Sequence, residues 1–135
     1  MQVTGGNGLV DLLITSNSPN RCYTVLKFKN KQIDFLALGS GSRTNKAEQL
    51  VAMSLPQILK LRITGLHNLG TIEEWIEGDI HQQLRSYVTG ATVQAGRAGM
   101  TFRAYAVVII GSRHIIIREM DSEGEWIGGS RLIQM

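Results

Sequence analysis

Near its beginning the chain carries one carboxylate and two ammonium groups in apolar surroundings. Asp11 interrupts the run from Leu9 to Ile14, and Lys27 and Lys29 lie two positions apart in a segment with the period-two alternation of a strand. If the two segments pair through the turn residues 17–20, Asp11 lies near Lys27 and Lys29. Because buried charges need partners, these residues predict a charged cluster on an otherwise apolar sheet.

A helix farther along the chain supplies two more polar side chains. Thr71 and Glu74 have the spacing of a capping box, which predicts that a helix begins here. Its apolar residues recur every fourth position, at Ile72, Ile76, Ile80, Leu84 and Val88. Gln83 and Tyr87 lie one turn apart beside this stripe, so both can face the sheet edge that holds Asp11 and Lys29.

The remaining pattern predicts the elements that position these groups. We expect strands at 9–15 and 22–29, a third strand or strand continuation at 32–38, and a loop at 39–42. A helix capped by Thr44 or Asn45, a short helix opened by Ser54 and Pro56, and the helix 71–88 follow. A loop or a frayed helix end at 90–99 precedes a strand at 102–110 buried on both faces. The Gly111-Ser112 turn then leads to a strand at 113–119 and to a tail that is loosely ordered or an edge strand.

These residues resemble a known family. Gly6-Asn7-Gly8 before Asp11, a turn, and a strand that ends in Phe28-Lys29-Asn30 are similar to the PD-(D/E)XK, or restriction-endonuclease-like, superfamily, especially the nuclease-like domains of AAA-ATPase-like proteins. Gln83-Leu84-Arg85-Ser86-Tyr87 is similar to the family's helix after the catalytic strand. The resemblance spans roughly residues 6–119.

The resemblance implies a fold and a chemistry. The fold is α/β, a central mixed β-sheet flanked by helices, here a restriction-endonuclease-like core that lacks the leading helix. The resemblance implies that residues 1–135 form a single nuclease-like domain, either a fragment of a larger protein or a divergent short member. By resemblance Asp11 is the metal ligand, Lys29 the catalytic lysine and Gln83 the residue that orients water. The cofactor is Mg²⁺ or Mn²⁺, and the substrate is nucleic acid, with DNA favoured over RNA.

The sequence departs from the family at Lys27, which occupies the place of the motif glutamate. An ammonium group supplies no lone pair to a divalent ion and repels it, so Asp11 alone makes a weak site unless Asp34, Glu48 or Gln83 adds an oxygen. We therefore expect impaired metal-dependent phosphodiester hydrolysis. The alternative is a catalytically inactive nuclease-fold module, without cofactor, that serves protein–protein interaction or dimerisation.

Each of these residues also has a purely structural interpretation. Asp11 can be an exposed strand residue, although its apolar neighbours argue against this. Lys29 can be an edge-strand lysine that discourages aggregation. Gln83 and Tyr87 can be the shoulder of an amphipathic helix. The basic residues Arg43, Lys46, Lys60, Arg62, Arg85, Arg97 and Arg103 are scattered, and they form a phosphate-contacting groove only if the fold brings several together.

Composition excludes other classes. With 135 residues, 43% hydrophobic and 19% charged, the chain fits one globular domain, and its net charge of +3 permits nucleic-acid binding. The single Cys22 excludes an internal disulfide framework, and the three histidines share no metal-ligand spacing. No membrane span or signal peptide is visible, so we expect an intracellular protein, cytoplasmic or nuclear. Without a leading helix, one sheet face would expose apolar side chains, which predicts a homodimer.

Overall fold

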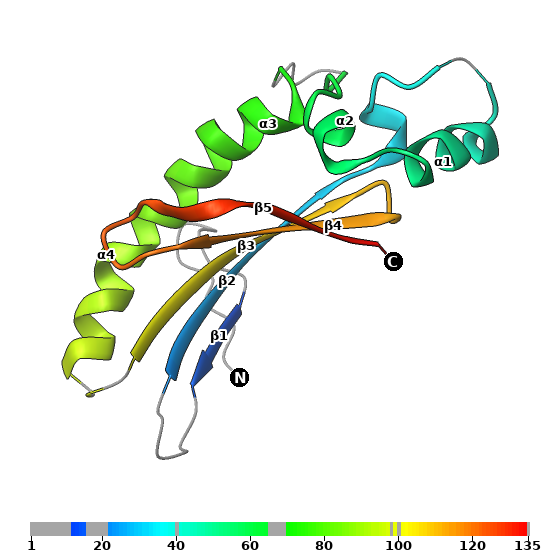
Figure 1. Ribbon diagram of the computed structural model, residues 1–135. Coiled ribbons are helices and arrows are strands. Elements are labelled where there is room, and N and C mark those ends of the chain that lie inside the picture. The colour runs from blue at the N-terminus through cyan, green and yellow to red at the C-terminus, as the bar shows by residue number, and fades with distance from the viewer. Residues whose placement is uncertain are drawn as a thin grey trace.

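The computed structural model describes residues 12–15, 22–39, 41–64, 70–97, 99 and 101–134. These residues form a five-stranded sheet that carries one long helix across a face and smaller helices at one end (Figure 1). The strands lie in the sheet in their chain order: β1 (Leu12–Thr15), β2 (Cys22–Lys31), β3 (Thr101–Ile110), β4 (His114–Met120) and β5 (Trp126–Gln134). Only the β2–β3 pair is parallel, so this is the mixed sheet of an α/β fold.

The first two strands form the expected hairpin. They pair antiparallel in a register that sets Leu12 opposite Leu26 and Thr15 opposite Tyr23. The expected start of the first strand, including Asp11, lies outside the described residues. The hairpin prediction is confirmed for the part of the chain that the structure describes.

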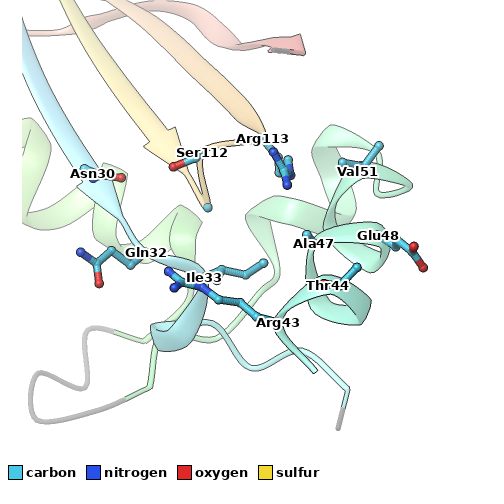
Figure 2. Close-up of a pocket in the computed structure, with 11 residues that line it drawn as sticks. Asn30, Gln32, Ile33, Arg43, Thr44, Ala47, Glu48, Val51, Ser112 and Arg113 are labelled. Carbon is cyan, nitrogen blue, oxygen red and sulfur yellow. The ribbon is translucent and has the colours of Figure 1, made fainter. Parts of the chain in front are cut away.

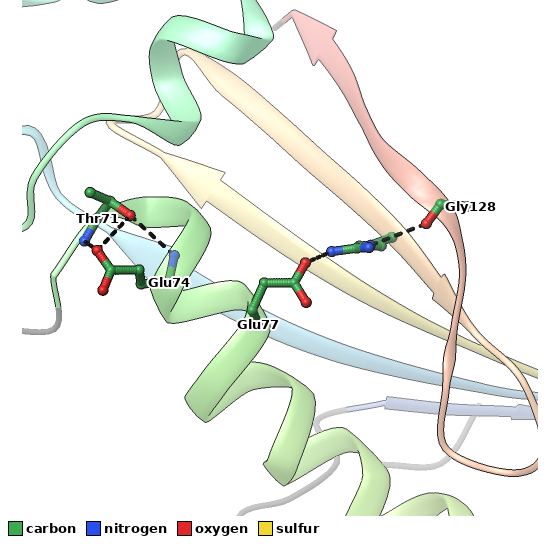
Figure 3. A network of polar contacts seen from close by, with 5 residues as sticks. Thr71, Glu74, Glu77 and Gly128 are labelled. Atoms are coloured by element: carbon green, nitrogen blue, oxygen red, sulfur yellow. Dashed lines mark hydrogen bonds and ion pairs between the residues drawn. The ribbon is translucent and has the colours of Figure 1, made fainter.

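One continuous helical rod follows Thr71. It consists of α3 (Ile72–Trp75), the π-helical segment η3 (Ile76–Ile80) and α4 (His81–Arg97). The expected capping box is present, because the Thr71 hydroxyl accepts the Glu74 N–H at 3.2 Å and the Glu74 carboxylate accepts the Thr71 N–H at 3.2 Å (Figure 3). The capping chemistry therefore fixes where the rod begins.

The rod ends later than the sequence predicts. A loop or a frayed helix end was expected from Gly90, but the backbone remains regularly helical to Arg97. Ala91 is buried and extends the apolar stripe, and the Thr92 hydroxyl donates to the Val88 carbonyl at 2.7 Å. Packing of Ala91 against the core outweighs the low helix propensity of Gly90, which is roughly 1 kcal/mol per glycine.

The apolar stripe of the rod packs on one face of the sheet, as expected. Its five residues from Ile72 to Val88 are almost completely buried, together with the alternate residues of β3: Ala104, Ala106, Val108 and Ile110. The intervening β3 residues Tyr105, Val107 and Ile109 are only half-buried. The prediction that this strand is buried on both faces is therefore wrong, because the rod covers a single face.

Arg118 of β4 joins the sheet to the π-helical segment. Its guanidinium pairs with the Glu77 carboxylate and donates from Nε to the Gly128 carbonyl at 3.3 Å (Figure 3). It also lies 4.9 Å from the centre of the Trp126 ring. The side chain of Arg118 is mostly buried. The contact ties the rod to β4 and β5 at the point where the helix departs from α-geometry.

The segment 32–38 is not the expected third strand. Ile33–Phe35 form a 3-10 turn, η2, and Leu36 makes only an isolated bridge to Ile63. Ile33 and Leu36, three positions apart, are the buried residues, whereas Phe35 is exposed. A spacing of three is that of a helical turn, so packing of these two side chains selects the turn.

Two short helices continue from this turn. The first, α1 (Arg43–Val51), is capped by Ser42, whose hydroxyl accepts the Asn45 N–H at 3.2 Å, and not by Thr44 or Asn45 as expected. The second, α2 (Leu55–Leu59), follows Ser54 and has Pro56 in its first turn, as predicted. Both lie at the end of the sheet where β2 finishes (Figure 1).

The last three strands are connected as a meander. The expected hairpin forms, but its loop contains three residues, 111–113, because Ile110 pairs with His114. Gly111 and Ser112 both have φ of 57°, and the Arg113 N–H donates to the Ile110 carbonyl at 3.0 Å. The tail forms β5 at the edge of the described sheet.

The second face of the sheet is not covered by any helix of the described residues (Figure 1). Large apolar side chains are exposed there, at Phe28, Ile127 and Ile133. Within the same described ranges, no helix is long and apolar enough to cross a membrane.

Candidate functional site

The sequence-predicted lysines lie on the helix-covered face of β2. The strand alternates, so that Tyr23, Val25, Lys27, Lys29 and Lys31 project to the side of the rod. Tyr23 and Val25 are buried, Lys27 is only 3% exposed, and Lys29 and Lys31 are half-buried. The strand thus carries a row of three lysines that leads from the core to the solvent.

Two contacts fix the rod on this strand in an antiparallel sense. The Lys31 ammonium lies 4.7 Å from the centre of the Trp75 ring, near the start of the rod. At the other end of the strand, Tyr87 hydrogen-bonds Tyr23. Gln83 lies one turn before Tyr87, between the two contacts, and is half-buried. The rod therefore sets Gln83 over the part of β2 that lies between Tyr23 and Lys31.

The tyrosine pair has a perturbed titration. Burial raises the pKa of Tyr23 above its ordinary value, and the neighbouring Tyr87 hydroxyl, through charge repulsion and a hydrogen bond, raises it further. The Tyr23 ring also stacks on Phe102 with centroids 6.5 Å apart. The phenol is thus held neutral, as a hydrogen-bonding group under the rod.

The structure brings together three of the four predicted site residues. Lys27 and Lys29 share one face of β2, and Gln83 projects from the helix packed on that face. Asp11, the expected metal ligand, lies outside the described residues. In the described part of the chain, His, Cys, Asp and Glu nowhere gather in a group of three able to hold a metal ion.

The two other carboxylates considered as metal ligands belong to elements beyond the end of β2. Asp34 is in η2, where its exposed carboxylate pairs with the exposed Arg43 guanidinium at 3.7 Å. Glu48 is on α1 and exposed. Neither projects from the face of β2 that holds Lys27.

A polar cleft at this end of the sheet was not predicted from the sequence. It has a volume of about 880 Å³ and lies between α1, the end of β2 and the β3–β4 turn (Figure 2). Arg43 reaches it from α1 and Arg113 from the turn. The Gly111-Ser112 turn in the sequence could have revealed this cleft, because it places Arg113 beside the end of a strand.

The other basic residues of known placement do not join this cleft. Arg85 on α4 pairs with Glu125 at 3.7 Å. Arg103 is near the start of β3, at the opposite end of the strand, where its Nη1 donates to the Tyr105 hydroxyl at 3.3 Å and that contact raises the pKa of Arg103. Of the arginines discussed, Arg43 and Arg113 therefore line one cleft, whereas Arg85 and Arg103 lie elsewhere.

Comparisons of the chain with protein-family models, with curated proteins and with solved structures find no significant match.

Proposed function

We propose that this chain is a PD-(D/E)XK-type nuclease-like domain that binds nucleic acid, DNA in preference to RNA, with impaired metal-dependent phosphodiester hydrolysis. The observation that carries the proposal is the position of Lys27 and Lys29 on the face of β2 that lies under the Gln83 helix. Lys29, at the position of the motif lysine, and Lys27, at the position of the motif glutamate, thus share one face of the sheet. Gln83 lies on the helix that covers this face.

The order of the elements supports the proposal. A hairpin, a helix across its face and a strand parallel to the second hairpin strand follow in this order, while the third strand that the resemblance implies at 32–38 is replaced by a 3-10 turn. The proposal requires the β1–β2 ladder to extend by one pair beyond Leu12 and Leu26, because Asp11 would then stand opposite Lys27.

The residues in place do not fit a divalent metal ion. Mg²⁺ binds hard oxygen ligands, and at the position of the motif glutamate the chain has a buried ammonium group instead. The repulsion between Lys27 and a cation on the same sheet face opposes metal binding. What remains on this face are Lys29 and Lys31, which are half-buried and can contact phosphate, and this gives binding without efficient hydrolysis.

Charge reversal at Lys27 tests the proposal. We expect the natural protein to bind Mn²⁺ weakly and to cleave plasmid DNA slowly or not at all. In Lys27→Glu two carboxylates would flank the site, so Mn²⁺ binding by calorimetry and DNA nicking by gel assay should become measurable. Lys60→Glu makes the same charge change at an exposed position at the end of α2. This variant should leave Mn²⁺ binding and DNA nicking unchanged.

A further substitution tests whether Asp11 supplies one of the two carboxylates of the gained metal site. Asp11→Asn in the Lys27→Glu background should abolish the gained metal binding, and circular dichroism should show both proteins folded. Equal cleavage by the natural protein and by Lys27→Glu would instead mean that the second carboxylate comes from elsewhere, and the assignment of Lys27 to the glutamate position would be wrong.

A second candidate function, dimerisation as an inactive nuclease-fold module, is favoured by the uncovered sheet face. Ile133 of β5 is 48% exposed on the edge strand of the described sheet. The uncovered face around Ile133 can pack on the same face of a second copy about a two-fold axis, which covers the apolar side chains of both.

Sedimentation equilibrium tests the dimer. The natural protein should be dimeric, and Ile133→Glu should be monomeric because the interface would bury an unpaired charge. Val93→Glu places the same charge on the similarly exposed surface of α4 and should remain dimeric. A natural protein that stays monomeric at high concentration would contradict this candidate.

A further inference from the structure

The cleft at the end of β2 lies where the two parallel strands finish. Lys31 and Ile110 are register partners at the carboxyl ends of β2 and β3, and the chain leaves both strands around the cleft. In open α/β sheets, ligands bind outside the carboxyl ends of parallel strands, because the connections there diverge and leave a crevice. The volume of about 880 Å³ is within the range of ligand sites.

The walls of the cleft are held together by a brace. His114, buried at the start of β4, donates from Nε2 to the Leu50 carbonyl of α1 at 2.7 Å, since a carbonyl can only accept. The Gly111 N–H bonds the Lys31 carbonyl at 2.8 Å, and a Cβ at Gly111 would collide with the Leu50 side chain. The turn, β2 and α1 therefore form a site whose shape exists before any ligand arrives.

The turn carries local strain beside the cleft. Ser112 has a φ of 57°, in the left-handed region that residues other than glycine, asparagine and aspartate rarely adopt. Its side chain lines the cleft (Figure 2). Strained residues persist where the surrounding structure fixes them, and they are frequent at binding sites.

The chemistry of the lining suits an oxyanion. Arg43 and Arg113 come from opposite walls, and the hydroxyl groups of Thr44 and Ser112 and the amide of Asn30 add neutral donors (Figure 2). The carboxylate of Glu48 points away from both arginines in this view. The Arg43 pair with Asp34 is exposed at 3.7 Å and hence weak, so a phosphate can compete with it. Guanidinium groups bind phosphate through paired N–H donors.

We propose that this cleft binds the phosphate groups of a nucleic-acid strand, with Arg43 and Arg113 as the anchoring cations. The proposal rests on the proposed nuclease-like function and adds a phosphate-contact site outside the Lys27–Lys29 face. Contacts to phosphate position a strand without reading its sequence, so binding should depend on salt and hardly on base composition.

Fluorescence anisotropy with a labelled DNA oligonucleotide tests the cleft. Arg113→Gln and Arg43→Gln should each weaken binding by roughly tenfold at low salt and lower the salt dependence by about one unit of slope. Arg103→Gln removes the same charge from the opposite end of β3 and should bind like the natural protein. Affinities of Arg113→Gln and Arg43→Gln equal to that of the natural protein would overturn the inference.

The alternative ligand of the cleft is free phosphate. Titration with inorganic phosphate and with a mononucleotide distinguishes free phosphate from a nucleic-acid strand. Arginine-dependent binding of these anions by a protein that fails to bind the oligonucleotide would overturn the nucleic-acid assignment. The two proposals fail independently. If Lys27→Glu stays inactive while Arg113 and Arg43 govern DNA affinity, only the nuclease assignment fails. If Lys27→Glu gains cleavage and the arginine variants bind normally, only the cleft assignment fails.

Discussion

The covered part of β2 and the cleft at the end of this strand hold charged residues in opposite ways. Under the helical rod, Lys27 is buried among core side chains and its strand neighbours Tyr23 and Val25 are buried too. Past the rod, the strand ends at an open cleft where Arg43 and Arg113 are exposed. The same strand thus holds one lysine in a shielded place and leads to two arginines that are exposed to water.

The difference shows what a covering helix does to a charge. A buried ammonium group has lost its hydration and is held in one place, so it selects strongly among possible partners. Exposed guanidinium groups interact more weakly with any one partner, but they can meet a ligand that arrives from solution. In the two proposals above, the first region opposes metal binding and the second binds phosphate.

The largest expected effect concerns the helical rod that covers the sheet. Leu84→Ala removes a fully buried side chain of the rod, and we expect a loss of about 2–5 kcal/mol in the free energy of unfolding, measured by urea denaturation. Val51→Ala, at a 42% exposed position beside the cleft, should change it by less than about 1 kcal/mol. Similar losses in both variants would mean that the two regions do not differ in packing.

An intermediate effect is expected at the brace of the cleft. His114→Phe keeps an aromatic ring but removes the hydrogen bond to the Leu50 carbonyl, so stability should fall by about 0.5–1.5 kcal/mol in thermal or urea unfolding. DNA affinity should fall as well, because the walls of the cleft lose their fixed spacing. His81→Phe, at the histidine that contacts Trp126 and not α1, should keep the affinity. Unchanged DNA binding in His114→Phe would show that the brace has no part in the site.

The smallest expected effect concerns the pKa of Tyr23, which lies under the rod. The raised pKa of Tyr23 means that the folded state binds its proton more tightly than the unfolded state does, so this stabilisation is complete below the ordinary value of 10.0 and is lost as pH rises through the raised one. Tyr87→Phe removes the hydroxyl that contributes to the shift and leaves burial, so the pKa should fall part of the way. Ultraviolet difference spectroscopy of the phenols measures it. An unchanged Tyr23 titration would show that the two hydroxyl groups are not coupled.

Local signals in the sequence determine where several elements begin. The capping box at Thr71 and Glu74 needs only neighbouring residues, and the four-residue stripe from Ile72 identifies the covered face of the rod. The Gly111-Ser112 pair likewise specifies the β3–β4 turn, because two consecutive positive φ angles are required there. The alternation in β2 placed Lys27 and Lys29 on one face for the same local reason.

Signals that depend on packing were misread. Residues 32–38 have the composition of a strand, but Ile33 and Leu36 are buried together on a turn. Gly90 is typical of a helix end, yet Ala91 is buried and the helix continues. In both places the free energy of burying an apolar side chain against distant residues exceeds the local preference of the backbone.

The sequence by itself therefore determined the mixed α/β class, the hairpin, the beginning of the rod and the shared face of Lys27 and Lys29. Only the tertiary structure decided that Lys27 is buried and that Arg43 and Arg113, far apart in the chain, line one cleft. The physical reason is that periodicity and capping act between residues a few positions apart. Burial and the convergence of charges depend on the parallel pairing of β2 with β3 and on the packing of α1 against the turn between β3 and β4.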